Sequence, residues 1–313
     1  MYSLRGRDLL SIADLSIEEL KFIISTAEQL KQRFYAGERV IPLLNGKVLA
    51  MIFQKPSTRT RVSLEVAMLQ LGGFALNLSW NELQLGRGEP IKDTGRVLSR
   101  YVDGIAARVY KHDDLVELAK YSDKPVINAL SNLEHPLQAI ADMMTILEKK
   151  GYLTGLKMVF VGDGSDNVLH SLLLTAAKLG INLHIATPKG YDPKPEILKL
   201  AMEDAQVTGA TIEIIRDPIE AVKDADVIYT DVWISMGQES EREKRVKDLS
   251  PYQVNTGLVK YAKKNYIFMH CLPAKRGEEV TDEVIESPNS VVWDQAENRL
   301  HAQKAVLALL LRD

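Results

Sequence analysis

The sequence predicts an α/β fold of two domains, each a parallel sheet covered by helices on both faces. Apolar runs of strand length alternate with helical segments along most of the chain, an order that favours parallel sheets. The chain has 313 residues, and a single hydrophobic core stops growing near about 250–300 residues. An apolar content of 46% is enough for two cores and excludes a disordered chain.

Composition and charge narrow the function classes. The formal net charge is −3 and no basic block of five residues occurs, which argues against a nucleic-acid partner. The lone Cys271 has no second cysteine for an internal disulfide, which favours a reducing compartment. No apolar run approaches the roughly 18 residues of a membrane span, and charges interrupt the first sixteen positions, so no signal core is expected. We therefore expect a soluble cytoplasmic protein with no nucleic-acid or membrane partner.

In the first half of the chain, Ser16 and Glu19 have the spacing of a capping box and open a helix to about Phe34. Strands and helices then alternate. Strands are predicted near residues 47–53, 74–78, 104–109 and 125–129, and helices near 58–71, 90–102, 112–121 and 136–150.

The second half repeats this rhythm. Strands are predicted near residues 157–161, 181–186, 211–215, 226–230, 266–269 and 290–293, with helices between them and a last helix over about 295–313. The break falls at Lys149-Lys150-Gly151. We expect one domain over residues 1–150, onto which the last helix packs back, and a second over 151–294.

The segment from Phe53 to Arg61 joins a predicted strand to a predicted helix. Between them lie Pro56, which stops a helix, and Ser57, a candidate N-cap, followed by two Thr hydroxyls and two guanidiniums. Free N–H groups at a helix N-terminus, the helix dipole and Arg side chains together favour a phosphate or another compact dianion. A capped helix with solvated arginines is the alternative.

Other polar residues follow the remaining predicted strands. Because ligands of parallel sheets bind beyond the carboxyl ends of strands, these residues predict a site at that edge of each sheet. They are Arg108, His135 to Gln138, Gly162 to Asn167, Asp231 to Gly237, His270 to Pro273, and Glu297 to Arg299.

These motifs resemble the aspartate/ornithine carbamoyltransferase family from about Leu9 to Leu310. Residues 53–61 (FQKPSTRTR) and 135–138 (HPLQ) are similar to the carbamoyl-phosphate signatures of the whole family, and residues 231–237 (DVWISMG) and 270–273 (HCLP) resemble its ornithine branch. The resemblance implies transfer of a carbamoyl group from carbamoyl phosphate to the δ-amine of L-ornithine, giving L-citrulline and phosphate. It also implies an active site in a cleft between two domains, a homotrimer or higher assembly of trimers, and neither metal nor dissociable cofactor.

The resemblance assigns site residues position by position. It implies catalytic roles for Arg108, His135 and Cys271. It assigns carbamoyl phosphate to Ser57, Thr58, Arg59, Thr60, Gln84, Arg108, His135, Pro136, Leu137, Gln138, Cys271, Leu272 and Arg299, and ornithine to Asn167, Asp231, Ser235 and Met236.

The sequence departs from the family pattern at two places. Many relatives carry Glu where Gln54 stands, a position just before the phosphate segment where we expect little effect. Either Asp166 or Asn167 would meet the ornithine carboxylate, and Asn167 is favoured because an acid would repel that carboxylate.

Carbamoyl transfer sets three chemical requirements. The phosphate must be held as the C–O bond breaks, which suits the segment from Ser57 to Thr60. The carbonyl oxygen must be stabilised as it gains charge, and Thr60, Arg108 and His135 are donors of that kind. The attacking amine must lose a proton, because an amine of pKa about 10.4 is only about one part in a thousand neutral at pH 7. Cys271 is the candidate that assists; its alternative role is an inert, small hydrophobic side chain.

Several alternatives stay open. Asp231 either pairs with the α-ammonium of ornithine or caps a helix. The run over residues 239–248, with eight charges, is either a solvated face or a lid over the amino-acid site. The twelve-residue connection over 79–90 is long for its type, and the resemblance implies that its Gln84 reaches a neighbouring subunit.

Other functions fit less well. A nicotinamide dehydrogenase needs Gly-x-Gly-x-x-Gly, and Asn167 stands where the third glycine should be. A non-catalytic binding protein would not need both His135 and Cys271. A carbamoyltransferase for another amine such as putrescine is the rival within the family, although putrescine has no carboxylate for the Ser-Met-Gly triplet to hold. The sequence leaves open whether the reaction serves arginine synthesis or breakdown.

Overall fold

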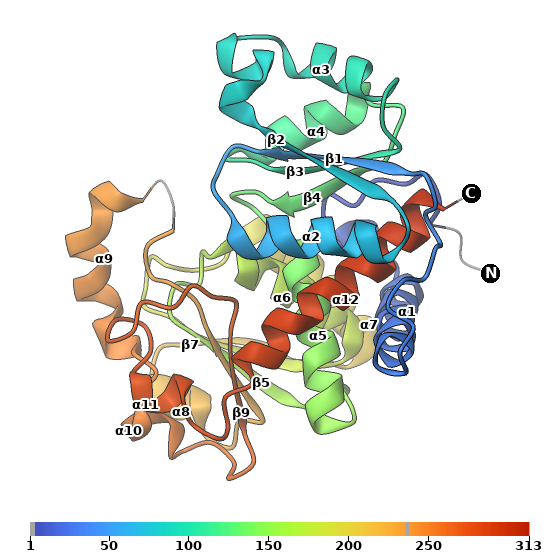
Figure 1. Cartoon of the computed structure of the whole chain (residues 1–313). Helices are drawn as coiled ribbons and strands as arrows, with labels where there is room; N and C mark the ends of the chain where they lie inside the picture. The colour runs from blue at the N-terminus through green and yellow to red at the C-terminus, as the bar shows by residue number, and fades with distance from the viewer. Residues whose placement is uncertain (1–3, 236–237, 313) are drawn as a thin grey trace. The chain divides into compact units, whose positions relative to one another are not determined.

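The computed structural model of the chain describes residues 4–235 and 238–312 (Figure 1). The described residues form two compact units. Unit 1 is drawn from the ranges Met1–Met144 and Glu297–Asp313, and unit 2 from Thr145–Ala296.

Unit 1 contains a four-stranded parallel sheet with the strand order β2-β1-β3-β4. Its strands are β1 (Val48–Phe53), β2 (Phe74–Ser79), β3 (Gly104–Arg108) and β4 (Val126–Leu130). Its helices are α1 (Ile17–Tyr35), α2 (Thr58–Gln70), α3 (Ile91–Leu98) and α4 (His112–Tyr121), together with most of α12 (Val292–Leu311). In Figure 1, α3 and α4 lie over one face of this sheet and α2 lies over the other.

In the sheet of unit 1, the central strand β1 and the edge strand β2 differ in the burial of their side chains. In the central strand β1, Leu49 to Ile52 are all buried, as expected for a strand covered on both faces. In the edge strand β2, Phe74 is 63% exposed and Leu76 is 47% exposed. The outer side of β2 therefore leaves large apolar side chains uncovered within this chain.

The predicted capping box at the start of α1 is confirmed. The Ser16 hydroxyl accepts from the Glu19 backbone N–H at 3.1 Å, and the Ser16 backbone N–H donates to the Glu19 carboxylate at 2.9 Å. These two bonds satisfy donors that the first helical turn otherwise leaves without partners.

Unit 2 contains a five-stranded parallel sheet with the order β7-β6-β5-β8-β9. Its strands are β5 (Lys157–Val161), β6 (Asn182–Ala186), β7 (Ile212–Ile215), β8 (Val227–Thr230) and β9 (Ile267–His270). Its helices are α6 (Asn167–Leu179), α7 (Pro195–Thr208), α8 (Pro218–Val222), α9 (Arg242–Leu249), α10 (Thr256–Val259) and α11 (Asp282–Ile285), and α5 (Pro136–Lys150) crosses the boundary between the units. The prediction of an α/β chain with two parallel sheets is confirmed.

The strand predicted over residues 290–293 is wrong. Ser290 forms only an isolated bridge with Phe268, and α12 already begins at Val292. Trp293 is 58% exposed, so this run does not have the burial of an interior strand. The backbone N–H of Gln295 donates to the carbonyl of Val291 at 2.9 Å, which shows that the chain has turned into the helix by that point.

Among the helices of the described residues, none combines the length and the apolar content that crossing a membrane requires.

Candidate functional site

In unit 1, parallel pairing brings the carboxyl ends of three strands together. Phe53, the last residue of β1, is in register with Arg108 at the end of β3, and Arg108 is in register with Leu130 at the end of β4. The segment after β1, the side chain of Arg108 and the segment before α5 therefore start from one edge of the sheet, as the sequence predicts.

The helix N-terminus after β1 provides donors for an anion. Ser57 is the N-cap residue of α2, yet its hydroxyl makes no capping hydrogen bond, and Thr58 begins the helix. The first N–H groups of an α-helix have no acceptor within the helix, and the first turn of α2 holds no acidic residue. Arg59 is half-buried and Arg61 is exposed. This terminus has the features that bind phosphate groups.

Arg299 links three helices beside this terminus. From α12, its guanidinium donates to the Thr60 hydroxyl of α2 at 2.9 Å and to the Gln138 side-chain oxygen of α5 at 2.6 Å. The Gln138 amide nitrogen donates to Asp142 at 2.8 Å, which fixes the orientation of that amide. Because the Thr60 oxygen accepts from Arg299, its own proton can be donated to another acceptor.

His135 is buried beside this group. Burial, followed by the positive charges of Arg299 and then Arg108, holds the pKa of His135 well below its ordinary value. The imidazole is therefore neutral at physiological pH and can donate a hydrogen bond without adding a positive charge. We call Thr60, Arg108, His135, Gln138 and Arg299 the basic cluster.

The segment just before His135 is held by hydrogen bonds within itself and by hydrogen bonds to the N-terminal part of the chain. The Ser131 hydroxyl accepts from the backbone N–H groups of Leu133 and Glu134, each at 3.2 Å. The buried Glu134 carboxylate accepts from the backbone N–H of Ile12 at 3.1 Å and from the hydroxyl of Ser11. The N-terminal segment of the chain thereby holds the residue next to His135.

The remaining residues assigned to this side have different surroundings. Pro136 begins α5, whereas the side chain of Leu137 is completely buried and belongs to the core, so only its backbone can face a ligand. Gln84 begins a short 3₁₀ helix, and its side chain is exposed while the neighbouring Leu85 is buried. Among the described residues, the Gln84 side chain has no hydrogen-bond partner.

In unit 2, the start of α6 distinguishes the two adjacent candidates. Asp166 is the N-cap residue, and its carboxylate accepts from the N–H groups of Val168 at 2.8 Å and Leu169 at 3.1 Å. Asn167 is the first helical residue and is half-buried. Since Asp166 already serves the helix, this arrangement leaves Asn167 as the better candidate to meet a ligand.

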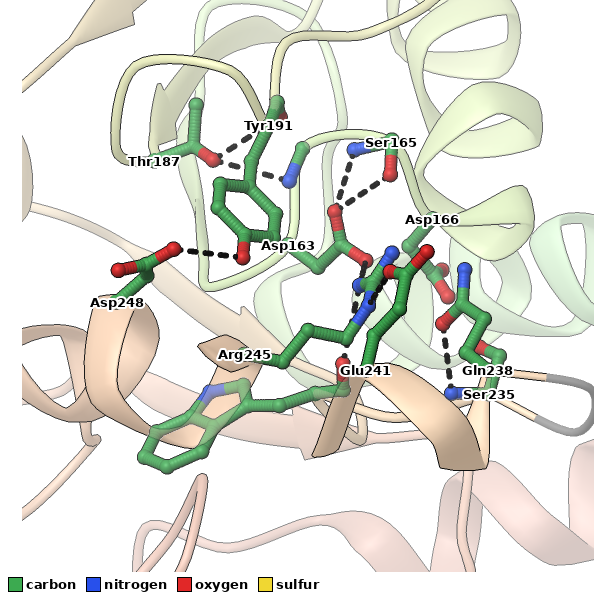
Figure 2. Close-up of polar contacts among 12 residues, drawn as sticks. Asp163, Ser165, Asp166, Thr187, Tyr191, Ser235, Gln238, Glu241, Arg245 and Asp248 are labelled. Carbon is green, nitrogen blue, oxygen red and sulfur yellow. Dashed lines mark hydrogen bonds and ion pairs between the residues drawn. The ribbon is translucent and has the colours of Figure 1, made fainter. Parts of the chain in front are cut away.

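A buried ion pair joins α9 to the segment after β5 (Figure 2). The Arg245 guanidinium donates to Asp163 at 2.6 Å and to the carbonyl of Trp233 at 3.2 Å. Asp163 also accepts from the backbone and the hydroxyl of Ser165, at 2.9 and 2.7 Å. Tyr191, whose ring lies near Arg245, donates from its hydroxyl to Asp248 at 3.0 Å.

The charged run over residues 239–248 is thus mostly a solvated face with one exception. Its side chains are largely exposed, but Arg245 is only 7% exposed. Whether this run closes over a ligand stays a prediction.

Three buried acids gather at the carboxyl edge of the sheet in unit 2. Burial, followed by the charges of Asp231 and Asp163, raises the pKa of Asp166 well above its ordinary value. Burial also raises the pKa of Asp231, and the neighbouring His270, the thiol of Cys271 and the N–H of Val232 offset this only in part. We call Asp163, Asp166 and Asp231 the acidic cluster.

His270 is the last residue of β9, and Cys271 follows it beside Asp231. The thiol of Cys271 donates to Asp231. The Nδ1 atom of His270 accepts from the backbone N–H of Leu272 at 2.9 Å, and its Nε2 atom lies 3.0 Å from the buried carboxylate of Glu279. Because Nδ1 accepts, the proton of this ring lies on Nε2, which faces Glu279. Leu272 has a φ of 58°, and its bond to Pro273 is cis.

Side chains of Asp231, His270 and Cys271 are of the types that bind metal ions, and their ligand atoms lie within 4.8 Å of one another. Both ring nitrogens of His270 already have partners in Leu272 and Glu279. An ion could therefore use His270 only by breaking one of these hydrogen bonds, and the arrangement is not a preformed metal centre.

Ser235 is half-buried, and its backbone N–H donates to the side-chain oxygen of Gln238 at 3.0 Å (Figure 2). Met236, which the sequence assigns to ornithine, lies outside the described residues.

Sequence reasoning missed two residues of unit 2. Glu279 follows Lys275, Arg276 and Gly277 in a stretch that has the composition of an exposed loop, yet it is fully buried against His270. Arg245 is one of eight charges in a run with no internal sign of which side chain turns inward. No periodicity or spacing in the sequence distinguishes either residue.

Two family models match nearly the whole chain. Residues 7–148 match the aspartate/ornithine carbamoyltransferase carbamoyl-P binding domain. Residues 154–310 match the Asp/Orn binding domain of the same family.

Individual proteins are similar over the same length. The chain is 64% identical over 310 residues to an ornithine carbamoyltransferase of Staphylothermus marinus, covering 99% of each chain. It is 61% identical over 311 residues to an anabolic ornithine carbamoyltransferase of Pyrococcus furiosus, covering 99% of this chain and 98% of that protein. A solved structure of ornithine carbamoyltransferase from P. furiosus superimposes with a TM-score of 0.96 at 61% identity, covering 99% of both chains.

Proposed function

This chain belongs to the aspartate/ornithine carbamoyltransferase family, and we propose that it transfers the carbamoyl group of carbamoyl phosphate to the δ-amine of L-ornithine. The products are L-citrulline and phosphate. The observation that carries the proposal is a separation of charge. One unit places cations and neutral donors at its sheet edge, and the other places buried acids at its own.

Carbamoyl phosphate belongs with the basic cluster. The N–H groups of α2, the hydroxyls of Ser57 and Thr58 and the side chain of Arg59 suit the phosphate. Arg108, His135 and the free proton of Thr60 suit the carbonyl oxygen. The neutral state of His135 keeps it a donor that can stabilise the oxyanion without placing a third cation beside Arg108 and Arg299.

Ornithine belongs with the acidic cluster. The amino acid carries two ammonium groups, and burying Asp166 and Asp231 together is costly without a cation near them. Asp231 suits the α-ammonium, while Asn167 and Ser235 offer neutral donors for the carboxylate. We also assign Met236 to ornithine on the family resemblance.

The chemical step needs a neutral amine. The δ-nitrogen attacks the carbonyl carbon, the bond from carbon to the phosphate oxygen breaks, and the nitrogen loses one proton, which the departing phosphate accepts. Cys271 lies beside Asp231, to which its thiol donates, and this pair would assist removal of the proton from the ornithine ammonium. We also assign Cys271, Leu272 and Arg299 to carbamoyl phosphate on the family resemblance.

We also propose that the chain assembles as a homotrimer or a higher assembly of trimers. The exposed Phe74 and Leu76 on the edge strand β2 support this, since uncovered apolar side chains on an edge strand favour association. Gln84 lies five residues after the end of β2 and is exposed, as a residue that serves a neighbouring subunit would be.

Complementation tests this shared site. Gln84→Glu and Arg108→Ala should each abolish most activity, and reassociated mixtures should regain part of it in hybrid trimers. A mixture that stays inactive despite proven subunit exchange would place the whole site within one chain.

Putrescine is the second candidate acceptor, because it is also a cationic amine. Asn167 and Ser235 favour ornithine, since they provide neutral groups for a carboxylate that putrescine lacks.

The name of the P. furiosus relative supports arginine biosynthesis as the metabolic direction of the reaction, and the lone Cys271 supports a cytoplasmic location of the protein.

One assay tests the proposed function. The purified chain receives carbamoyl phosphate with ornithine, putrescine or aspartate in turn, and the carbamoylated product is identified by mass. We expect citrulline from ornithine and no more than traces from the other two. Faster carbamoylation of putrescine would replace ornithine as the acceptor, and no product from any amine would overturn the proposal.

A further inference from the structure

The sequence alone predicts little effect of Gln in place of Glu at position 54, but from the contacts of this residue we propose that Gln54 is a positioning residue that sets Arg108 relative to the phosphate segment, and that it must be an amide because of Asp114. This inference rests on the proposed function, since it concerns how carbamoyl phosphate is held. All the residues that carry it belong to unit 1.

Gln54 holds the end of β3 at two points. Its backbone N–H donates to the carbonyl of Arg108 at 2.9 Å, and its side-chain oxygen accepts from the backbone N–H of Tyr110 at 2.6 Å. One residue thus binds the chain on both sides of Val109. The adjacent Lys55 is buried, and its ammonium lies 4.3 Å from the centre of the Tyr110 ring, which adds a second contact to the same turn.

The position of Gln54 in the chain makes its hydrogen bonds to Arg108 and Tyr110 relevant to the proposed carbamoyl-phosphate site. Gln54 immediately follows β1 and stands three residues before Ser57, where the phosphate segment begins. The strand register also breaks between Ala107 and Arg108, so β4 does not hold Arg108 in a regular ladder. The distance between the phosphate segment and the Arg108 guanidinium therefore depends on Gln54.

The remaining donor of Gln54 explains why this residue is an amide. Its side-chain nitrogen donates to the carboxylate of Asp114, in the first turn of α4, at 3.3 Å. A glutamate at position 54 would keep the acceptor for Tyr110 but would place a second carboxylate against Asp114. Like charges at this distance repel and push the two groups apart. We infer that Gln54 and Asp114 form a matched pair, and that a glutamate at 54 requires a donor at 114.

A double-mutant cycle tests the pair. We expect Gln54→Glu to raise the KM for carbamoyl phosphate about tenfold, with a smaller fall in kcat, because Arg108 is displaced from the bound carbonyl. Asp114→Asn, which retains an acceptor for Gln54, should raise that KM no more than about twofold. The double variant should return to within about threefold of the parent, since the Asn amide can donate to the new carboxylate.

Asp113 supplies the matched control. It lies in the same first turn of α4 but is exposed, and Asp113→Asn removes the same charge. The variant Gln54→Glu with Asp113→Asn should stay as impaired as Gln54→Glu alone. Gln54→Met removes the side-chain bonds without adding charge, so it should raise the KM but gain nothing from Asp114→Asn. Melting temperatures separate a local shift of Arg108 from a general loss of folding.

The outcomes decide between the alternatives. An unchanged KM in Gln54→Glu, or rescue by Asp113→Asn equal to that by Asp114→Asn, would overturn the pair. So would a loss of activity in which KM and kcat simply follow the fraction of folded protein. Parent enzyme without activity would instead count against the proposed function, and the same variants would then be compared by calorimetric binding of inorganic phosphate.

Discussion

The basic cluster of unit 1 and the acidic cluster of unit 2 respond to burial in opposite ways. In the basic cluster, burial and two guanidiniums lower the pKa of His135, so that cluster contains one positive charge fewer than its composition suggests. In the acidic cluster, burial and neighbouring carboxylates raise the pKa values of Asp166 and Asp231. Each cluster disfavours further charge of its own sign. The countercharge that each lacks is the one that its proposed substrate carries.

The basic side of this comparison is tested by removing a phosphate ligand. Arg59→Ala should lower kcat/KM for carbamoyl phosphate at least 10²-fold, about 2.7 kcal/mol, because the guanidinium serves a charge that grows as the C–O bond breaks. Steady-state kinetics with varied carbamoyl phosphate measure this change in kcat/KM. Arg61→Ala is the control, since Arg61 lies two residues further along α2 and is exposed. An equal loss in both variants would assign the effect to general charge rather than to the helix terminus.

The acidic side is tested at Asp231. Asp231→Asn keeps an acceptor but loses the charge, and we expect the KM for ornithine to rise about 30-fold, or about 2 kcal/mol, which is typical of a hydrogen bond to a charged group. The KM for carbamoyl phosphate should stay within a factor of two, as the acids of unit 2 do not serve it. Glu243→Gln makes the same charge change at an exposed position of α9 and should leave both constants near those of the parent. If Asp231→Asn raised the two KM values together, the assignment of one substrate to each cluster would fail.

The fold could be predicted because its determinants are local. Apolar runs such as Leu49 to Ile52 and the Ser16 capping box specify β1 and the start of α1 without reference to distant residues. The error at residues 290–293 has the same origin. Val291, Val292 and Trp293 have the composition of a strand, but only one bridge forms at Ser290 and the exposed Trp293 belongs to a helix.

The candidate site could be predicted only where a motif marks it. Arg299 was assigned by resemblance, but its contacts with Thr60 and Gln138 join segments far apart in sequence. Glu279 and Arg245 were missed because a charged residue in a polar stretch is ordinarily solvated, and only tertiary packing buries these two. Burial of an individual charged side chain depends on the tertiary packing of the whole unit, so no local sequence pattern predicts it.

The pH dependence of the melting temperature tests the difference between the two clusters, and Asp166 of the acidic cluster is the first residue to vary. Its pKa is raised on folding, so it contributes stability that is present below its unfolded value near 3.8 and is lost as the pH rises through the folded value. Asp166→Asn keeps an acceptor for the cap of α6 and removes the buried charge. We expect the melting temperature to rise by about 3 °C at pH 8, with the gain shrinking towards pH 4.

Asp217 provides the control for this measurement. It caps α8 in the same unit, accepting from Ile219 at 2.8 Å and Glu220 at 3.4 Å, but its side chain is exposed. Asp217→Asn should therefore change the melting temperature little at either pH. A gain for Asp166→Asn that is the same at pH 8 and pH 4 would show that relief of buried charge is not its cause.

The smallest expected effect concerns His301 of unit 1, which gives the opposite pH dependence. Burial, followed by Lys304 and Lys31, lowers the pKa of His301 to about 3, and the ring packs 5.5 Å from that of Phe34. Its stability contribution is fully present above the unfolded value near 6.5 and is lost progressively as the pH falls towards about 3. The limiting slope is about 1.4 kcal/mol per pH unit, or roughly 2 °C in the melting temperature of a chain of this size.

Replacing the imidazole by a side chain that cannot titrate, as in His301→Gln, should lower the melting temperature at pH 7 but remove this extra loss between pH 6.5 and 5.5. Ala302→Gly, at the adjacent buried position of α12, provides a destabilised control that leaves the imidazole in place and should keep the full acid slope. Equal acid slopes in parent, control and His301→Gln would show that His301 does not account for the acid sensitivity of unit 1.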